Sequence, residues 1–370
     1  MEEVVIVITD LYLSNEAEAA SIREVHLPGL ARVARYGTSR PLGSLGHGWR
    51  SWLAAWSGQE SLIESAPATV AAAASRVTAE DAKDRMAWIA TPVHLVAGLS
   101  SVHLDARGLV QVELEVRRDL ALDFNKVFGE SGFRLEALPS AGFLMSGPRI
   151  ADPDIVDPAR VLGASITGVL PEASNAPTLR RLVAEIEMWL HDHPVNVARQ
   201  RRGRLPITAL WLWGGGIARE GVALDLERLH TDTMDTVPAS VVRGAALEAT
   251  GIPVPGAAFG ADPFLHGLWR LSGTIARALP RTFEEVLGYS GRRAVFALEL
   301  SQAFEENRSW SLRDALMDVD RRWISSALEA LRKRDIARVT VVANDHVLSL
   351  GSRDPWKLWR MPRPALTALQ

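Results

Sequence analysis

The chain has 370 residues, which suggests two structural units at about 150 residues per domain. Apolar residues make up 47% and charged residues 23%, and this balance excludes disordered and collagen-like chains. A net charge of −3 gives no strong positive field, so neither nucleic acid nor a membrane is expected as a partner. The chain has no cysteine, so any metal must be held by Asp, Glu, His or hydroxyl ligands.

The N-terminal segment predicts a central strand. Val4–Ile8 is a continuous apolar, β-branched run that ends in Thr9-Asp10, and strands apolar on both faces belong in the middle of a helix-covered sheet. Two acids and no basic residue precede this run, which favours a strand over a signal peptide and predicts a cytoplasmic location. Residues 27–37 then show the periodicity of a helix.

A tryptophan-rich segment follows. Trp49, Trp52 and Trp56 recur at helical spacing, which favours core packing, although a surface that binds a partner is the alternative. Residues 64–79 are rich in Ala, Ser and Thr and predict a linker or weak helix. We place the first boundary in that stretch, so that residues 1–76 form the first part of a core domain.

The middle of the chain has a different pattern. Residues 87–147 read as short strands around one helix, which indicates a compact α+β unit, and residues 179–190 form an amphipathic helix. We assign residues 77–204 to an inserted α+β domain. The apolar run 207–213 predicts a strand of the second core segment, and the glycines at 214–216 are interpreted as a tight strand-to-helix turn.

The last third returns to alternation of strands and helices. Residues 293–300 and 338–343 predict strands, and Ser311 with Asp314 resembles a capping box for the helix between them. Such units favour a doubly wound, mostly parallel sheet. The predicted fold is therefore α/β, with residues 205–370 as the second part of the core around the smaller inserted domain.

Chemistry in such a sheet sits beyond the carboxyl ends of its strands. Asp10 follows the first strand, and Asp345 and His346 follow the last predicted one, so their side chains converge if those strands are neighbours. Two carboxylates and an imidazole suit a divalent cation, and Ser44 in a glycine-rich turn is a candidate nucleophile activated by it. The alternative is structural: Asp10 and Asp345 as helix caps, and Ser44 as a turn residue.

Two other groups are candidates for binding. The arginines between 199 and 204 are dense enough for a phosphate or carboxylate clamp, with Asn196 and Arg199 as its members, and surface solvation is the equal alternative. Asp262 and His266 could share one helical face, but Pro263 between them favours helix capping.

A family resemblance enters with HPVNVARQRRGRLPITALWLWGGG, residues 193–216. It resembles a signature of bacterial proteins of the cofactor-independent phosphoglycerate mutase group, in the alkaline phosphatase superfamily, and looks most like their RpfE-type regulatory branch. MAWIATPVHLVAG and RRLVAEIEMWLHDHPVN are similar to that branch too. Residues 27–37 look like the early helix of the superfamily, and residues 314–346 look like its helix–strand–metal segment.

The resemblance implies an alkaline phosphatase-like core. Active relatives carry two divalent metals (Mn, Mg or Zn) and a Ser or Thr nucleophile that forms a phosphoenzyme. Asp10 matches their first aspartate, Ser44 their nucleophile, and Asp345 with His346 their late Asp-His pair. The second metal site requires Asp-x-x-x-His in the stretch 299–310, which reads ELSQAFEENRSW and has no histidine. No histidine follows His346.

This departure leads to three hypotheses. The first is a phosphoglycerate mutase-like protein with a degenerate metal site and one divalent metal or none. It would be a regulatory or ligand-sensing protein with little or no catalysis, able to bind a small phosphorylated ligand or a protein partner. The alternative is an active metal-dependent phosphomutase or phosphatase that uses the Ser44 nucleophile on a small phosphate ester. The third is an interaction protein whose twelve tryptophans supply a binding surface.

Overall fold

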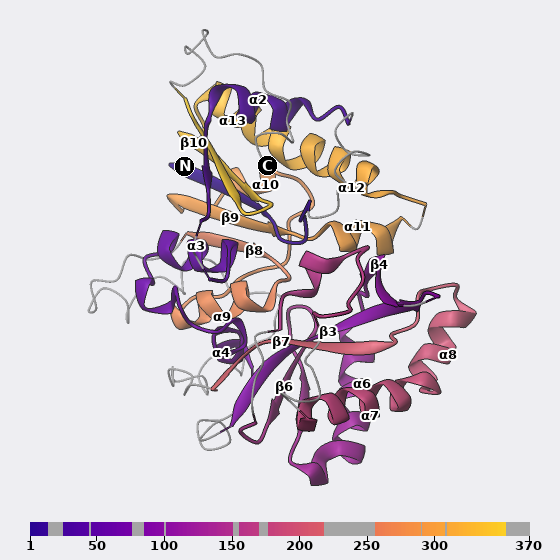
Figure 1. Cartoon of the computed structure of the whole chain (residues 1–370). Helices are drawn as coiled ribbons and strands as arrows, with labels where there is room; N and C mark the ends of the chain where they lie inside the picture. The colour runs from indigo at the N-terminus through magenta and orange to yellow at the C-terminus, as the bar shows by residue number, and fades with distance from the viewer. Residues whose placement is uncertain are drawn as a thin grey trace.

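The computed structural model describes residues 1–13, 25–43, 46–75, 85–99, 101–150, 155–169, 177–217, 256–289, 291–307 and 309–352. Ser44 and the C-terminal Trp356 and Trp359 lie outside these ranges. The described residues form two regions, each built on its own sheet, and Figure 1 shows them one above the other. No described helix combines the length and the apolar character that crossing a membrane requires.

The upper region of Figure 1 is built on a six-stranded, mostly parallel sheet. In spatial order its strands are β2 (Thr38–Pro41), β11 (His346–Gly351), β10 (Arg338–Ala343), β1 (Glu3–Ile8), β9 (Arg293–Leu298) and β8 (Ala257–Gly260). The central β1 pairs in parallel with β10 and β9, and β9 pairs in parallel with β8, whereas β11 and β2 extend the sheet in antiparallel fashion.

Helices cover both faces of this sheet, as the sequence predicted. Val4 and Ile6 of β1 pack in one hydrophobic cluster with the first group of helices, whereas Val5 and Val7 pack in another with the second. The first group is α2 (Pro28–Tyr36), α10 (Glu284–Leu287), α11 (Leu300–Glu306), α12 (Leu312–Val319), a π-helical turn (Asp320–Ser325) and α13 (Ser326–Lys333). The second is α3 (Trp49–Trp56) and α9 (Pro263–Leu271).

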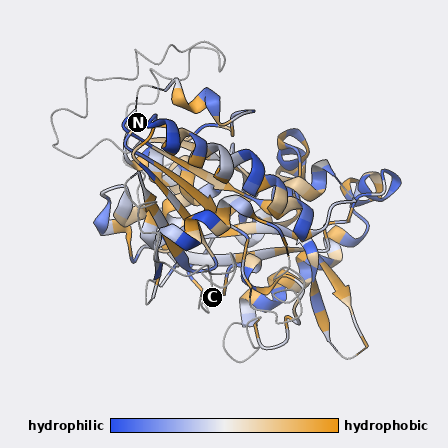
Figure 2. Cartoon of the chain, turned by 90° about the horizontal axis from the view of Figure 1, so that it is seen from above, coloured by the Kyte–Doolittle hydropathy of each residue, from blue (hydrophilic) through white to orange (hydrophobic). Residues whose placement is uncertain are grey.

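Two local predictions are confirmed in this region. Ser311 and Asp314 form the capping box at the start of α12, with both reciprocal hydrogen bonds present. Figure 2 shows the parallel strands largely in the hydrophobic colour and the helices two-coloured, as expected for strands buried between layers of amphipathic helices.

The lower region contains an antiparallel sheet. Its strands follow the order β4 (Val102–Leu109), β3 (Met86–Ala97), β6 (Phe143–Gly147) and β5 (Arg134–Ala137), and β7 (Ala209–Ile217) pairs with β3. The helices that pack on this sheet are α6 (Leu114–Phe128), α7 (Pro177–His191) and α8 (Pro194–Arg201). The described residues also form short 3-10 turns, namely η1 (Glu60–Leu62), η2 (Ala72–Ala74), η3 (Gly129–Ser131) and η4 (Pro158–Val161).

The glycines at 214–216 correct the prediction made for them. They do not form a strand-to-helix turn, because β7 continues through them to Ile217. A Cβ atom at Gly214 would lie 3.0 Å from Pro67, and one at Gly216 would lie 2.6 Å from Ala66, so the glycines let a short helix approach the strand closely. β7 pairs with β3, so it is part of the antiparallel sheet of the lower region.

The short helix that approaches β7 is α4 (Pro67–Ala71), in the stretch predicted as a linker or weak helix. It is a packed element: Ala68 and Ala71 are buried in the core of the lower region, whereas Val70 is buried in that of the upper region. A Cβ atom at Gly267 of α9 would lie 1.9 Å from the Val70 carbonyl oxygen, which shows how closely the two helices pack. Figure 1 shows α4 between α9 and β7.

Candidate functional site

The carboxyl ends of β1 and β10 lie side by side, as predicted, because these strands are parallel neighbours. Asp10 follows β1 and is buried. Its two carboxylate oxygens accept hydrogen bonds from the backbone N–H groups of Leu300 (2.7 Å) and Ser301 (2.8 Å), at the start of α11. Burial raises the pKa of Asp10, and these two N–H groups oppose that rise. Asp10 is therefore placed as a helix cap contributed by a distant segment.

Asp345 and His346 lie at the turn between β10 and β11. The two carboxylate oxygens of Asp345 accept hydrogen bonds from both terminal nitrogens of Arg160, at 2.7 and 2.8 Å. Gly48 permits this pair to approach, because a Cβ atom there would lie 2.8 Å from both the Arg160 guanidinium and the Asp345 carboxylate. The Nδ1 atom of His346 lies 2.9 Å from the carbonyl oxygen of Asn344. A guanidinium thus holds the carboxylate predicted as a metal ligand.

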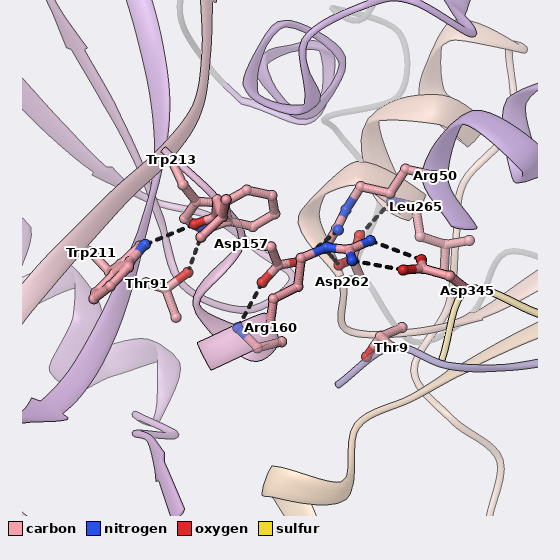
Figure 3. A network of polar contacts seen from close by, with 12 residues as sticks. Thr9, Arg50, Thr91, Asp157, Arg160, Trp211, Trp213, Asp262, Leu265 and Asp345 are labelled. Carbon is pink, nitrogen blue, oxygen red and sulfur yellow. Dashed lines mark hydrogen bonds and ion pairs between the residues drawn. The ribbon is translucent and has the colours of Figure 1, made fainter. Parts of the chain in front are cut away.

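A second arginine, Arg50 of α3, is the centre of the network in Figure 3. Its terminal nitrogens contact Asp157 at 2.7 Å and Asp262 at 3.1 Å, and its guanidinium carbon lies 4.3 Å from the ring centroid of Trp49 and 4.6 Å from that of Trp213. Although burial disfavours the charged form, the two aspartates raise the pKa of Arg50. Arg50 is therefore a buried, permanently charged cation.

The two arginines join the upper and lower regions reciprocally. Asp157 is the N-cap residue of turn η4, and its side chain accepts a hydrogen bond from the backbone N–H of Ala159. Turn η4 itself contains Arg160. Asp157 forms an ion pair with Arg50 of the upper region, and Arg160 forms one with Asp345 of the upper region. One short turn of the inserted region thus offers both an anion and a cation to the sheet edge.

A cavity of about 80 Å³ lies beside Arg50, large enough for several water molecules or a small anionic group. Its polar lining includes Thr9, Asp10, Arg50, Thr91, Gln111, Asp157, Asp262, Glu299 and Ser301. Burial and the charges of Asp10 and Asp262 raise the pKa of Glu299 to about 8, so this carboxyl is mostly protonated at neutral pH. Gln111 donates a hydrogen bond to it at 3.0 Å. A cation and a proton donor therefore face the same small space.

The fit of these residues to the metals that the resemblance implies can be judged from their donors. Both oxygens of Asp10 and both oxygens of Asp345 already accept hydrogen bonds from N–H groups. Within the described ranges, no three His, Asp or Glu side chains are grouped to hold a metal ion. In this arrangement N–H donors occupy the Asp10 and Asp345 carboxylates. Ser44 lies outside the described residues.

The stretch expected to carry the second metal site forms α11 instead. Glu299 precedes that helix and lines the cavity, whereas Glu305 lies 3.5 Å from Arg199 and 3.3 Å from Arg204. The side chain of Glu306 lies outside the described residues. One of these glutamates thus faces the candidate site, and another takes part in ion pairs between the two regions.

The predicted anion clamp, Asn196 and Arg199, is buried and bonded to backbone. The Asn196 amide donates to the carbonyl oxygens of Leu190 and Ile207, each at 2.7 Å, and accepts the N–H of Ile207. Arg199 donates to the carbonyl oxygens of Leu205 (2.7 Å) and Gln111 (3.1 Å). These bonds hold the arginine-rich loop against α8. They also connect Arg199 to the backbone of Gln111, a residue that lines the cavity beside Arg50. Direct ligand binding would require Asn196 to give up such contacts, whereas the second terminal nitrogen of Arg199 has no hydrogen-bond partner among the described residues.

Sequence reasoning missed Arg50, Asp157 and Arg160. The one local signal was Asp157-Pro158, an N-cap residue followed by proline at the first helical position. The same signal at Asp262-Pro263 was interpreted as capping, and this is confirmed, because Asp262 accepts the backbone N–H of Leu265 at 3.0 Å. No local sequence pattern indicated that Arg50 forms ion pairs with Asp157 and Asp262.

No protein-family model matches the chain. A 2,3-bisphosphoglycerate-independent phosphoglycerate mutase of Methanothermobacter thermautotrophicus is 30% identical over 118 residues, which are 31% of this chain and 29% of that protein. A probable enzyme of the same name from Geobacter sulfurreducens is 34% identical over 64 residues, 17% of this chain and 16% of that protein. The matched segments thus span less than a third of these curated relatives.

Two solved structures align with nearly the whole chain. The cofactor-independent phosphoglycerate mutase of Thermoplasma acidophilum covers 95% of this chain, with 90% of its own chain aligned, at 16% identity and a TM-score of 0.37. A protein from Pyrococcus horikoshii covers 99% of this chain, with 92% of its own chain aligned, at 13% identity and a TM-score of 0.44. The short sequence matches by themselves show weak homology to 2,3-bisphosphoglycerate-independent phosphoglycerate mutases.

Proposed function

We propose that this chain is a phosphoglycerate mutase-like protein whose metal site is degenerate, and that it acts as a regulatory or ligand-sensing protein with little or no catalysis. The RpfE-type branch, to which residues 193–216 are similar, is the regulatory group we propose for it. The observation that carries this proposal is the bidentate pairing of Asp345 with Arg160. A guanidinium supplies there the positive charge that a metal ion supplies in an active relative.

The chemistry of phosphoryl transfer explains why this substitution matters. In-line displacement uses paired metal ions to stabilise the attacking and the leaving oxygen atoms. A guanidinium neutralises a carboxylate but cannot activate a hydroxyl nucleophile by coordination. Loss of such stabilisation costs roughly 3–4 kcal/mol per group, and each ~1.4 kcal/mol is a factor of ten in rate. A chain with this arrangement would keep the scaffold and lose turnover.

A small phosphorylated compound is the ligand we propose for the cavity beside Arg50. The guanidinium would pair with a phosphate oxygen, and the protonated Glu299 would donate a hydrogen bond to a second oxygen. Trp213 and Trp49, which lie against the guanidinium, exclude water from it and strengthen the attraction. A protein partner that responds to the ligand, and a cytoplasmic location without nucleic-acid or membrane partners, remain predictions.

The test combines metal content with activity. We expect protein purified without chelators to contain no stoichiometric Mn, Mg or Zn by elemental analysis. We also expect no mutase turnover on 3-phosphoglycerate with added Mn²⁺. Arg160→Gln, which frees the Asp345 carboxylate, should increase Mn²⁺ binding in a calorimetric titration. Arg118→Gln, at an exposed position on α6, is the matched control and should leave it unchanged.

The alternative is an active metal-dependent phosphomutase or phosphatase with Ser44 as nucleophile. It is favoured by the neighbouring carboxyl ends of β1 and β10, which bring Asp10 and Asp345 to one edge of the sheet. One or two equivalents of metal that Asp10→Ala removes, together with turnover that Ser44→Ala abolishes, would establish this alternative and refute the proposal above.

A further inference from the structure

A larger hollow lies on the face of the parallel sheet beside α3. Its volume is about 620 Å³, within the range of roughly 300–1,000 Å³ typical of small-molecule sites. Its floor is formed by side chains of β2, β11, β10 and β1, and Trp52 and Trp56 of α3 form one wall. It is separate from the cavity beside Arg50, since no residue lines both.

The floor of this hollow is polar, which is unusual for strands at the centre of a parallel sheet. Strand register places Arg293, Glu3 and Arg338 in one row across β9, β1 and β10. A second row runs from Thr340 through Ser349 to Thr38, across β10, β11 and β2. The opposite face of β10 carries Val339 and Val341 in the hydrophobic core. The polar residues of these two rows thus lie on the face of the sheet that borders the hollow.

The carboxylate of Glu3, in the floor of the hollow, already has partners within the protein. Glu3 accepts hydrogen bonds from the Thr340 hydroxyl at 2.8 Å and the Trp56 indole N–H at 3.0 Å, and Arg293 lies 3.9 Å from it. Arg40 and Arg338 also line the hollow and are exposed. Neither makes a side-chain hydrogen bond or ion pair within the described part of the chain. The hollow therefore offers two uncompensated positive charges and no free negative one.

An aromatic wall faces these charges. The rings of Trp52 and Trp56 are stacked, with centroids 6.3 Å apart and planes 23° apart. The guanidinium carbon of Arg293 lies 3.8 Å from the ring centroid of Trp56, so this second ring is held between two neighbours. Trp52 is only partly buried, and its indole N–H makes no hydrogen bond with a described residue. Trp52 is thus the ring available for stacking with a ligand.

We propose that this hollow is a binding site for an anionic small molecule that carries a flat ring, namely a nucleoside phosphate. The ring stacks on Trp52, and the phosphates pair with Arg338 and Arg40. Register puts Arg338 opposite Gly351 and Arg40 opposite Val347, on strands two apart, so their Cα atoms are roughly 16 Å apart in a regular sheet. Two arginines spaced in this way can pair with different phosphate groups of one extended nucleotide.

Isothermal titration of the full chain with ATP, without added metal, tests this site. We expect saturable binding of ATP, with tripolyphosphate and adenosine each binding at least about tenfold more weakly, because each lacks one half of the recognised chemistry. Affinity should fall with rising salt, since the arginines are exposed. Absence of saturable ATP binding, or tripolyphosphate binding as tightly as ATP, overturns the proposal.

Variants locate the binding. Arg338→Gln, Arg40→Gln and Trp52→Leu should each weaken ATP binding about tenfold, whereas Arg118→Gln on the other region should leave it unchanged. Circular dichroism verifies that each variant is folded, which the exposure of both arginines favours. Glu299→Leu, which removes the proposed hydrogen-bond donor of the cavity beside Arg50, separates this site from that cavity: unchanged ATP affinity in that variant supports the hollow. A loss in that variant, with none in the arginine variants, refutes it. The inference does not depend on the proposed function, because it holds whether or not the metal site is active.

Discussion

Two places on the same sheet use arginine in opposite ways. At the carboxyl edge, Arg50 pairs with Asp157 and Arg160 pairs with Asp345 across the boundary between the two regions, and Arg50 also pairs with Asp262 within the upper region. In the hollow beside α3, Arg40 and Arg338 are exposed and unpaired within the described structure. The paired cations stabilise the contact between the two regions, although Arg50 also borders the cavity proposed for a ligand, whereas the unpaired cations can bind a ligand without the loss of an ion pair. Arginine thus has a mainly structural role in the first place and a proposed binding role in the second.

The largest expected effect is at Arg50. Arg50→Met should lower the free energy of unfolding by about 3–5 kcal/mol, because it leaves Asp157 and Asp262 buried without their cation. Urea denaturation followed by circular dichroism measures this change. The matched variant at the hollow, Arg338→Gln, should change the free energy by less than about 0.5 kcal/mol. Similar losses for the two variants would erase the contrast between the two places.

Gly48 provides the next largest effect. Its φ is +57°, and an added Cβ would lie 2.8 Å from both Arg160 and Asp345, so Gly48→Ala should cost about 1–3 kcal/mol of unfolding free energy. Gly43→Ala is a control for a positive φ without a close contact, because its φ is +63° and nothing lies within 4 Å of its Cβ. The loss in thermal unfolding should be larger at Gly48 than at Gly43. Equal destabilisation would show that the pair tolerates displacement.

A pH dependence is expected from Glu299. Its pKa of about 8 in the folded protein is above the ordinary 4.5, so between these values the folded state binds more protons than the unfolded state. Its contribution is therefore fully present below about pH 4.5 and is lost as pH rises towards 8. Glu299→Gln should remove this slope, so its stability relative to wild type should increase from pH 5 to pH 8. Glu115→Gln, at an exposed position, is the control; parallel curves for Glu299→Gln and wild type would contradict the assignment.

The elements of the parallel sheet could be predicted because their signals are local. The apolar runs at β1, β9 and β10, and the capping box of Ser311 with Asp314, are properties of short segments, and each element formed where predicted. The glycines of β7 were misread because their cause, the approach of α4, lies about 150 residues away in the sequence. A glycine inside a strand indicates that another segment packs closely against it, but the sequence alone does not show which segment that is.

The candidate site was predictable only in part. Asp10 and Asp345 were expected at one edge of the sheet because parallel strands end together, and their strands are indeed neighbours. Their partners could not be predicted: Arg160 is 185 positions from Asp345, and Asp157 is 107 positions from Arg50. Ion pairs between such distant segments leave no periodic signal in a single sequence. Among the tryptophans, Trp49 is buried as predicted, while Trp52 and Trp56 are partly exposed at the hollow.

The position of α4 has a consequence for how the whole molecule unfolds. This helix of five residues contributes buried side chains to the cores of both regions, and its neighbours on either side are β7 and α9. If either core unfolds, the other core loses its packing against α4. The two regions are therefore coupled as one cooperative unit, and a fragment that contains either sheet alone would expose the apolar surface that α4 covers.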